Sequence, residues 1–60
     1  MSNYKVGDVA EIVVLDISTA CIGEYVSVRV KDVQGSDILV YDANGTEVWV
    51  TAHHLEIVTD

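Results

Sequence analysis

The 60-residue sequence contains a single cysteine, Cys21, and only two histidines, His53 and His54. One cysteine excludes an internal disulfide, and a lone thiol is more typical of a reducing compartment than of a secreted protein. Structural zinc sites need several Cys or His ligands, so we do not expect a metal to hold the fold together. Because a chain this short buries only about 60% of its unfolded surface, we expect self-association or a partner to supplement its stability.

Positive charge and long apolar runs are also scarce. Three cations, Lys5, Arg29 and Lys31, stand against ten Asp and Glu, which gives a net charge of −7. Nucleic-acid affinity comes largely from Lys and Arg that neutralise phosphates, so direct nucleic-acid binding is not expected. The longest apolar run, residues 12–15, cannot span a membrane, and the first residues lack the basic and apolar regions of a signal peptide. We therefore expect a cytoplasmic protein without membrane contact.

The sequence is instead rich in β-branched residues that alternate with period 2, which favours strands. The dipeptide Asn44-Gly45 lies between two alternating runs and is the strongest short-range signal for a hairpin. Strands are predicted at residues 9–15, 25–33, 38–42, 46–51 and 55–58, with a 3₁₀ turn at residues 52–54 and a loop at residues 16–24. Five short strands predict a single all-β domain over residues 1–60, a partly open barrel, with an open meander as the alternative.

The quoted segments YKVGDVAEIVVLD, IGEYVSVRV, YDANG and EVWVTAHHLEIV together resemble the SH3-like barrel superfamily, including bacterial SH3 domains. The resemblance spans nearly all of residues 4–58 and implies a five-stranded SH3-like barrel. It also implies that Trp49 is a contact residue, because an aromatic at the matching position lines the ligand groove of peptide-binding SH3 domains. The loop sequence ISTACIGE contains no aromatic residue, and proline-rich peptides are recognised by several adjacent rings, so this activity is not expected.

Residues 22–55 also resemble the carbon storage regulator family of dimeric RNA binders. The similarity consists of the IG pair, the V-x-V-x-V run, the V-x-G turn and the E-V-x-V motif. That family binds RNA through basic residues on its first strand and just after E-V-x-V. Here those places hold Glu11, Asp16 and the segment Thr51-Ala52-His53, so the RNA-binding residues do not carry over.

No group of side chains indicates catalysis or a bound cofactor. We interpret His53 and His54 as a solvated pair in a turn, with a weak metal or pH-responsive contact as the alternative. Cys21 lies between apolar residues and lacks a neighbouring base, which indicates a half-buried structural thiol. Carboxylates around the predicted hairpin do not form the closely spaced ligand series of a calcium site. We therefore predict that the protein is not an enzyme and binds neither a metal nor a cofactor.

Apolar residues are in excess on the side of the strands that faces away from the predicted core. Val9, Val13 and Leu15 lie there on the first strand, and Val40 and Trp49 are assigned to the same side of the hairpin. Either the N-terminal arm or the long loop covers some of these residues, or they form an exposed patch of the kind that marks an interface. Aromatic residues are enriched at interface hot spots. The predicted partner-binding residues are therefore Trp49, Tyr41, Tyr25, Val13 and Leu15.

The leading functional hypothesis is a small, acidic, non-enzymatic protein-binding module with an accessory or regulatory role. It would dock through the exposed aromatic and apolar residues, and its charge would steer it toward a basic protein partner. One alternative is an inhibitor that imitates nucleic acid and occupies the cleft of a basic DNA- or RNA-binding protein. The other is a structural subunit that associates with copies of itself. The acidity itself has a simpler interpretation, which is solubility of a strand-rich surface.

Overall fold

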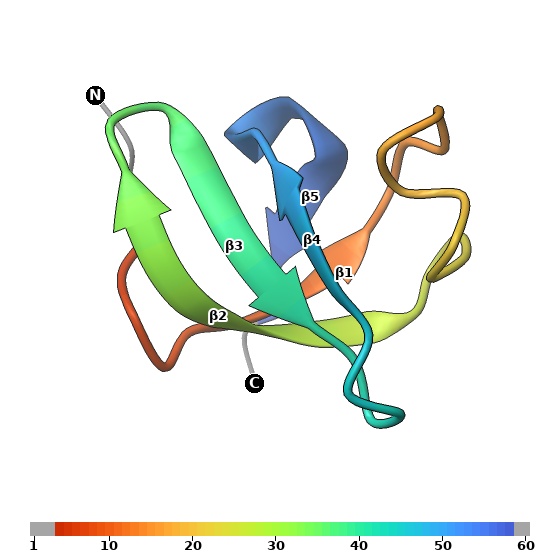
Figure 1. The fold of residues 1–60 in the computed structure, drawn as a ribbon, viewed down its shortest axis with the longest axis horizontal. Coiled ribbons are helices and arrows are strands. Elements are labelled where there is room, and N and C mark those ends of the chain that lie inside the picture. Colours follow the sequence, from red (N-terminus) through yellow and green to blue (C-terminus); the bar gives the residue numbers. More distant parts are fainter. Residues whose placement is uncertain (1–3, 59–60) are drawn as a thin grey trace.

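The computed structural model describes residues 4–58, which form one antiparallel sheet of five strands and contain no α-helix. The strands are β1 (Val9–Ile12), β2 (Ser27–Gln34), β3 (Asp37–Tyr41), β4 (Glu47–Val50) and β5 (Leu55–Ile57), with the 3₁₀ turn η1 (Ala52–His54) before β5 (Figure 1). The order β4-β3-β2-β1-β5 leaves β4 and β5 as unpaired edges, so the sheet is not closed. The predicted all-β, partly open barrel is confirmed, and the sheet is compatible with an SH3-like fold.

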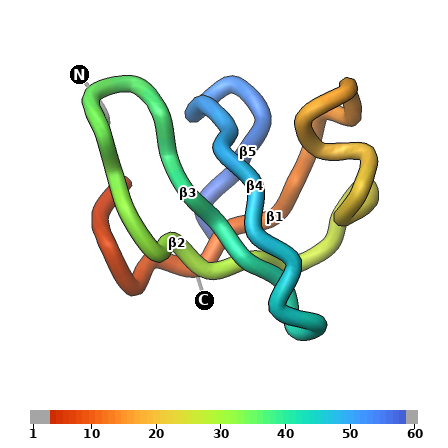
Figure 2. The backbone as a smooth tube through the Cα atoms, in the orientation of Figure 1, coloured from red at the N-terminus to blue at the C-terminus, as the bar shows by residue number. Residues whose placement is uncertain are grey.

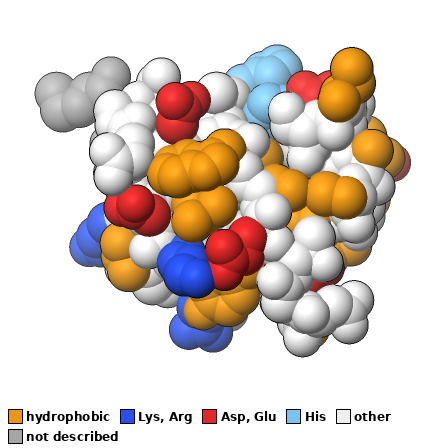
Figure 3. Space-filling model, in the orientation of Figure 1, with side chains coloured by type: hydrophobic (Ala, Val, Ile, Leu, Met, Phe, Trp, Pro, Cys, Tyr) orange, Lys and Arg blue, Asp and Glu red, His pale blue; other side chains and the backbone are white. Residues whose placement is uncertain are grey.

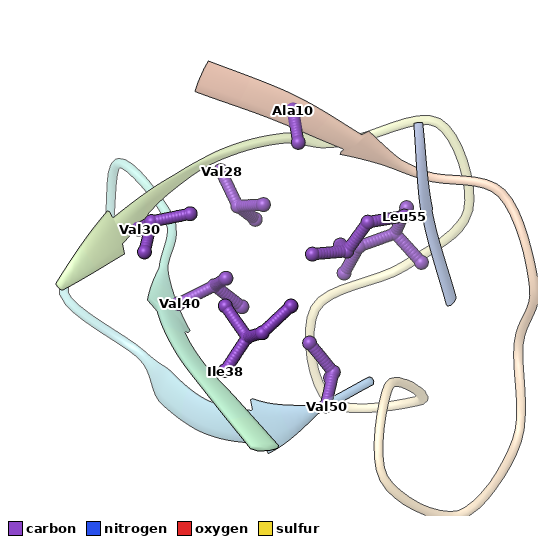
Figure 4. Close-up of a cluster of buried hydrophobic side chains, with 8 residues drawn as sticks. Ala10, Val28, Val30, Ile38, Val40, Val50 and Leu55 are labelled. Atoms are coloured by element: carbon purple, nitrogen blue, oxygen red, sulfur yellow. The ribbon is translucent and has the colours of Figure 1, made fainter. Parts of the chain in front are cut away.

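The strong curvature of the sheet encloses a core of small aliphatic side chains (Figure 4). β2 shows the alternation that builds it, because Val28 and Val30 are buried while Ser27, Arg29 and Lys31 are exposed. The buried hydrophobic residues are Ala10, Ile12, Val28, Val30, Ile38, Val40, Val50 and Leu55. Val40 is completely buried, so its assignment to the outward side of the hairpin is wrong. Alternation places Leu39, not Val40, beside Trp49 on the outside.

The hairpin between β3 and β4 is organised by one carboxylate. Asp42 is buried, and its Oδ1 accepts the backbone N–H groups of Asn44 and Thr46, at 3.0 and 2.9 Å. Gly45 supplies the positive φ of +84° that the turn requires. This turn sets the register of the hairpin, in which Tyr41 lies opposite Glu47 and Leu39 lies opposite Trp49.

The first strand ends at Ile12, three residues earlier than predicted. Beyond it, the Thr19 hydroxyl donates to the Val14 carbonyl at 2.8 Å, and the Asp16 carboxylate accepts the N–H groups of Ser18 and Thr19. These side chains compete with sheet pairing for the backbone groups, as Ser, Thr and Asp commonly do. The result is a compact loop over residues 13–26, orange to yellow in Figure 2, which stands at one side of the sheet.

The second strand begins at Ser27 and not at residue 25. Tyr25 has a left-handed backbone with φ of +61°, and its N–H donates to the Ile12 carbonyl. A residue with this φ cannot belong to an extended strand, so it redirects the chain into β2. Between β2 and β3, the register shifts between Val30 and Asp32, which marks a β-bulge.

No helix among residues 4–58 has the length and apolar character needed to cross a membrane.

Candidate functional site

The outward side of β3 and β4 carries an exposed aromatic and apolar surface. Trp49 is 47% exposed and lies directly opposite Leu39, while Tyr41 lies opposite Glu47. Side chains two residues apart on one strand share a face, so Tyr41 and Trp49 are diagonal neighbours across the hairpin. The surface extends onto β2, where Arg29 lies opposite Tyr41. We define the docking face as Arg29, Lys31, Leu39, Tyr41, Glu47 and Trp49.

An ion pair crosses the docking face. Lys31 Nζ lies 2.5 Å from Glu47 Oε2, which connects β2 to β4 over the top of β3. The hydrogen bond to Glu47 raises the pKa of the Lys31 amine. Both side chains are about half exposed, at 53% and 42%, and exposed pairs contribute little to stability. The pair can therefore be broken at small cost.

A shallow pocket of about 210 Å³ adjoins the docking face. It follows from the register, because Val9 of β1, Arg29 of β2 and Tyr41 of β3 form one row across three neighbouring strands. Its lining residues are Val9, Ser27, Val28, Arg29, Tyr41, Asp42 and Ala43. The pocket thus combines the side chains of Arg29, Tyr41, Asp42 and Ser27 with the apolar side chains of Val9, Val28 and Ala43.

The charge on this side of the molecule differs from the charge of the whole chain. Two of the three cations, Arg29 and Lys31, lie on β2 within the docking face. Figure 3 shows hydrophobic side chains gathered beside adjoining basic and acidic side chains on the side that carries β3 and β4. The exposed indole of Trp49 therefore lies near charges of both signs, because Asp32, Asp37 and Glu47 share this side of the sheet with the two cations.

The five predicted partner-binding residues fall into two groups. Tyr41 and Trp49 lie together on the docking face. Val13, Leu15 and Tyr25 belong to the loop of residues 13–26, next to the end of β1, which β2 and β3 separate from β4 in the sheet. In this second group Tyr25 is 66% and Leu15 is 47% exposed, while Val13 is partly buried. The structure does not join the two groups into one patch.

The interpretation of the two histidines as a solvated pair is wrong for His54. His53 is exposed, but His54 is buried and its Nε2 lies 2.5 Å from Asp16 Oδ2. The Nδ1 atom of His54 accepts the backbone N–H of Thr51 at 3.2 Å, as part of a capping box around η1. Since a backbone N–H only donates, the proton of the neutral ring is on Nε2, where it is donated to Asp16.

The Asp16, His54 and Thr51 side chains have the composition of a hydrolase triad, and Thr51 Oγ1 lies 3.2 Å from His54 Nδ1. A general base must have a free lone pair to take the hydroxyl proton. On His54 the lone pair of Nδ1 already accepts the backbone N–H of Thr51, and Nε2 is hydrogen-bonded to Asp16. The geometry thus ties the long loop to η1 and suits a structural connection.

Cys21 also differs from the sequence interpretation. Cys21 is exposed, not half-buried, and its Sγ lies 3.8 Å from the Ser18 carbonyl. Around the hairpin, the Asp42 carboxylate binds backbone N–H groups and Glu47 binds Lys31. Within residues 4–58, no group of three or more His, Cys, Asp or Glu side chains is placed to hold a metal ion.

Sequence reasoning missed the residues that complete the docking face, namely Leu39 and the Lys31–Glu47 pair. In the sequence, Leu39 is one residue of a short apolar run, and only the hairpin register places it opposite Trp49. Counting two residues back from the Asn44-Gly45 turn on each side would have paired Asp42 with residue 47. The observed turn instead pairs Asp42 with Thr46 through its backbone, which shifts the register by one.

In comparisons with known proteins, no family model matches this sequence, and no curated protein or solved structure gives a match.

Proposed function

We propose that this protein is a non-enzymatic protein-binding module of the SH3-like barrel superfamily, with an accessory or regulatory role in the cytoplasm. It docks through the docking face, with Trp49 as the central anchor. The observation that carries the proposal is the half-exposed indole of Trp49, which lies opposite Leu39 on an outward sheet surface. Indole and phenol side chains are the commonest energetic anchors of protein interfaces, and Tyr41 is the diagonal neighbour of Trp49.

Charge acts at two ranges in this proposal. The net charge of −7 attracts a basic partner at long range and raises the association rate at low salt. At contact, the partner meets Trp49 together with the Lys31–Glu47 pair, so a partner with interspersed charges of both signs fits the face. We expect added salt to lower the association rate much more than it raises the dissociation rate, since long-range attraction between exposed charges is screened.

A non-enzymatic role agrees with the commitments of the polar groups. The His54 ring has both nitrogens occupied by hydrogen bonds within the fold. The buried Asp42 carboxylate holds the hairpin turn. The His54 ring therefore has no free nitrogen for proton transfer to or from a substrate.

The test uses the fact that Trp49 is the only tryptophan, so intrinsic fluorescence reports on this one site. Proteins captured from the native cell by the wild-type chain are compared with those captured by Trp49→Ala and Leu15→Ala. Leu15 is the matched control, because it is also 47% exposed but belongs to the other predicted group. A captured protein is then purified and titrated against the chain while the emission of Trp49 is followed.

We expect Trp49→Ala to weaken binding at least about tenfold, Leu15→Ala to leave it unchanged, and the emission to shift to shorter wavelength on binding. Binding that is lost in Leu15→Ala and kept in Trp49→Ala would move the site to the loop of residues 13–26. An emission spectrum that does not change at saturation would contradict docking at Trp49.

A further inference from the structure

The edge of β4 presents unpaired backbone groups next to Trp49. The Asp42 N–H donates to the Thr46 carbonyl, so Asp42 and Thr46 form a hydrogen-bonded pair of the β3–β4 ladder. In an antiparallel ladder such pairs alternate with pairs that do not exchange hydrogen bonds. With the observed register, Val48 and Val50 therefore bond to β3, while the N–H and C=O groups of Glu47 and Trp49 point away from the sheet.

The same reasoning applied to the other edge gives a weaker candidate. Backbone hydrogen bonds from the Val13 N–H to the His54 carbonyl and from the Val58 N–H to the Val9 carbonyl fix the phase of the β1–β5 ladder. In this phase the backbone N–H and C=O groups of Leu55 and Ile57 point away from β1. β5 has three residues, against four in β4, and very short edges are one way in which proteins prevent pairing. β4 has no proline, and its register with β3 has no bulge, so it lacks two of the usual protections.

We propose that a second copy of this chain pairs with β4, antiparallel and edge to edge, so that the two sheets become continuous. Within β4, the register that uses both outward residues of each copy places Glu47 and Trp49 of one copy opposite Trp49 and Glu47 of the other. This register makes four backbone hydrogen bonds and places the twofold axis at Val48. The proposal depends on the backbone phase of β4 and does not rest on the docking function, although both involve Trp49.

The side chains of β4 are compatible with antiparallel pairing to β4 of a second copy. On the outer side, the two Trp49 residues become diagonal neighbours across the axis, about 7–8 Å apart at Cα, which is within reach of aromatic rings. On the inner side, the partly buried Val48 meets Val48 of the second copy. Each Glu47 is balanced by its own Lys31, so the seam brings no unpaired like charges together despite the net charge of each chain.

A second copy also meets two needs of this fold. A 60-residue chain has a small core, and self-association is a common supplement to stability at this size. The pairing covers the exposed edge, which otherwise remains open to uncontrolled association. It further joins the two docking faces into one surface with both indoles near its centre, so the second copy contributes residues to the candidate site.

The first test compares Glu47→Pro with Glu47→Ala by sedimentation over a micromolar to millimolar concentration series. Proline removes the outward N–H without removing a bond to β3, whereas alanine removes only the side chain and its pair with Lys31. Ile57→Pro is the matched control, since it removes an outward N–H from the other edge. We expect Glu47→Pro to raise the dimer dissociation constant about tenfold or more, with Glu47→Ala and Ile57→Pro remaining within a few fold of wild type.

The second test needs no variant and applies even if proline disturbs the fold. Amide hydrogen exchange of the wild-type chain is measured at low and high concentration. We expect Val48 and Val50 to be protected at both, and Glu47 and Trp49 to become protected only as the dimer forms. Added salt is expected to strengthen the dimer, because it screens the repulsion between two chains of charge −7.

Three results would overturn the proposal: a monomer at millimolar concentration, Glu47 and Trp49 amides that exchange quickly at every concentration, or a dimer that survives Glu47→Pro and is lost in Ile57→Pro. Failure of the docking function is recognised separately. Loss of partner binding in Trp49→Ala with a dimer that forms normally in the wild type bears on docking alone, and partner binding by the wild type at concentrations at which it is monomeric separates the two.

Discussion

His54 and Asp16, 38 positions apart in the sequence, are joined by a hydrogen bond between Nε2 and Oδ2. The Asp16 carboxylate also accepts the backbone N–H groups of Ser18 and Thr19, and His54 also accepts the Thr51 N–H. The pair thus links the first turn of the long loop to the 3₁₀ turn before β5. It lies where two segments outside the sheet, the long loop and η1, meet.

The acid stability of the protein should depend on Asp16. The hydrogen bond from His54, together with the N–H groups of Ser18 and Thr19, lowers the pKa of Asp16. A carboxyl whose pKa is lowered by folding adds stability above its unfolded pKa, and this is lost as pH falls through the folded value. We expect the melting temperature of the wild type to fall more steeply below about pH 4 than that of Asp16→Asn. Equal slopes in thermal melts of the two proteins would contradict this.

The two adjacent histidines should differ sharply on substitution. His54→Ala removes a buried side chain and the acceptor of the partly buried Thr51 N–H, and leaving such a donor unsatisfied costs about 1–3 kcal/mol. His53→Ala changes an exposed side chain, and such changes stay within about 0.5 kcal/mol. Urea denaturation measures both. A His53→Ala variant that is as unstable as His54→Ala would show that the hydrogen bonds of His54 do not stabilise the fold.

The strands could be predicted because each is governed by a local signal. Alternating valines place Val28 and Val30 in the core, and Asn44-Gly45 marks the hairpin, and both signals depend only on neighbours in the chain. The first strand was predicted to continue to Leu15, because its apolar run continues. The strand ends at Ile12 because the Thr19 hydroxyl donates a hydrogen bond to the Val14 carbonyl, which is then not paired in the sheet.

The candidate site was only partly predictable, because it depends on register. Trp49 and Tyr41 are recognisable as aromatic residues on a hairpin, but their neighbour Leu39 and the Lys31–Glu47 pair follow from cross-strand partners that no single strand specifies. A histidine likewise reads as solvated until its partner is known. The Asp16 carboxylate that accepts the His54 hydrogen bond belongs to a loop far away in the sequence, so the pattern of residues around His54 does not predict this contact.

Two glycines offer a matched test of the loop geometry. Gly23 has φ of +118°, outside the left-handed region that other residues reach, and a Cβ there would lie 3.3 Å from Val26 Cγ2. Gly35 has φ of +62° and nothing within 4 Å of its Cβ position. We expect Gly35→Ala to cost about 1 kcal/mol and Gly23→Ala clearly more, as measured by chemical denaturation. The reverse order would mean that the backbone near Gly23 relaxes without strain.

The stability of the hairpin that carries Trp49 should depend on the oxygen acceptor of the Asp42 side chain and not on its negative charge. Asp42→Ala leaves the Asn44 and Thr46 N–H groups without their acceptor in a partly buried turn, for an expected loss of about 1–3 kcal/mol. Asp42→Asn keeps an oxygen acceptor at the same place and should recover most of that loss. Because the turn sets Trp49 opposite Leu39, the alanine variant should also change the Trp49 emission in the folded state, and the asparagine variant should not. If both variants lose stability equally, the negative charge of Asp42 holds the turn, and the hydrogen bonds of its Oδ1 do not.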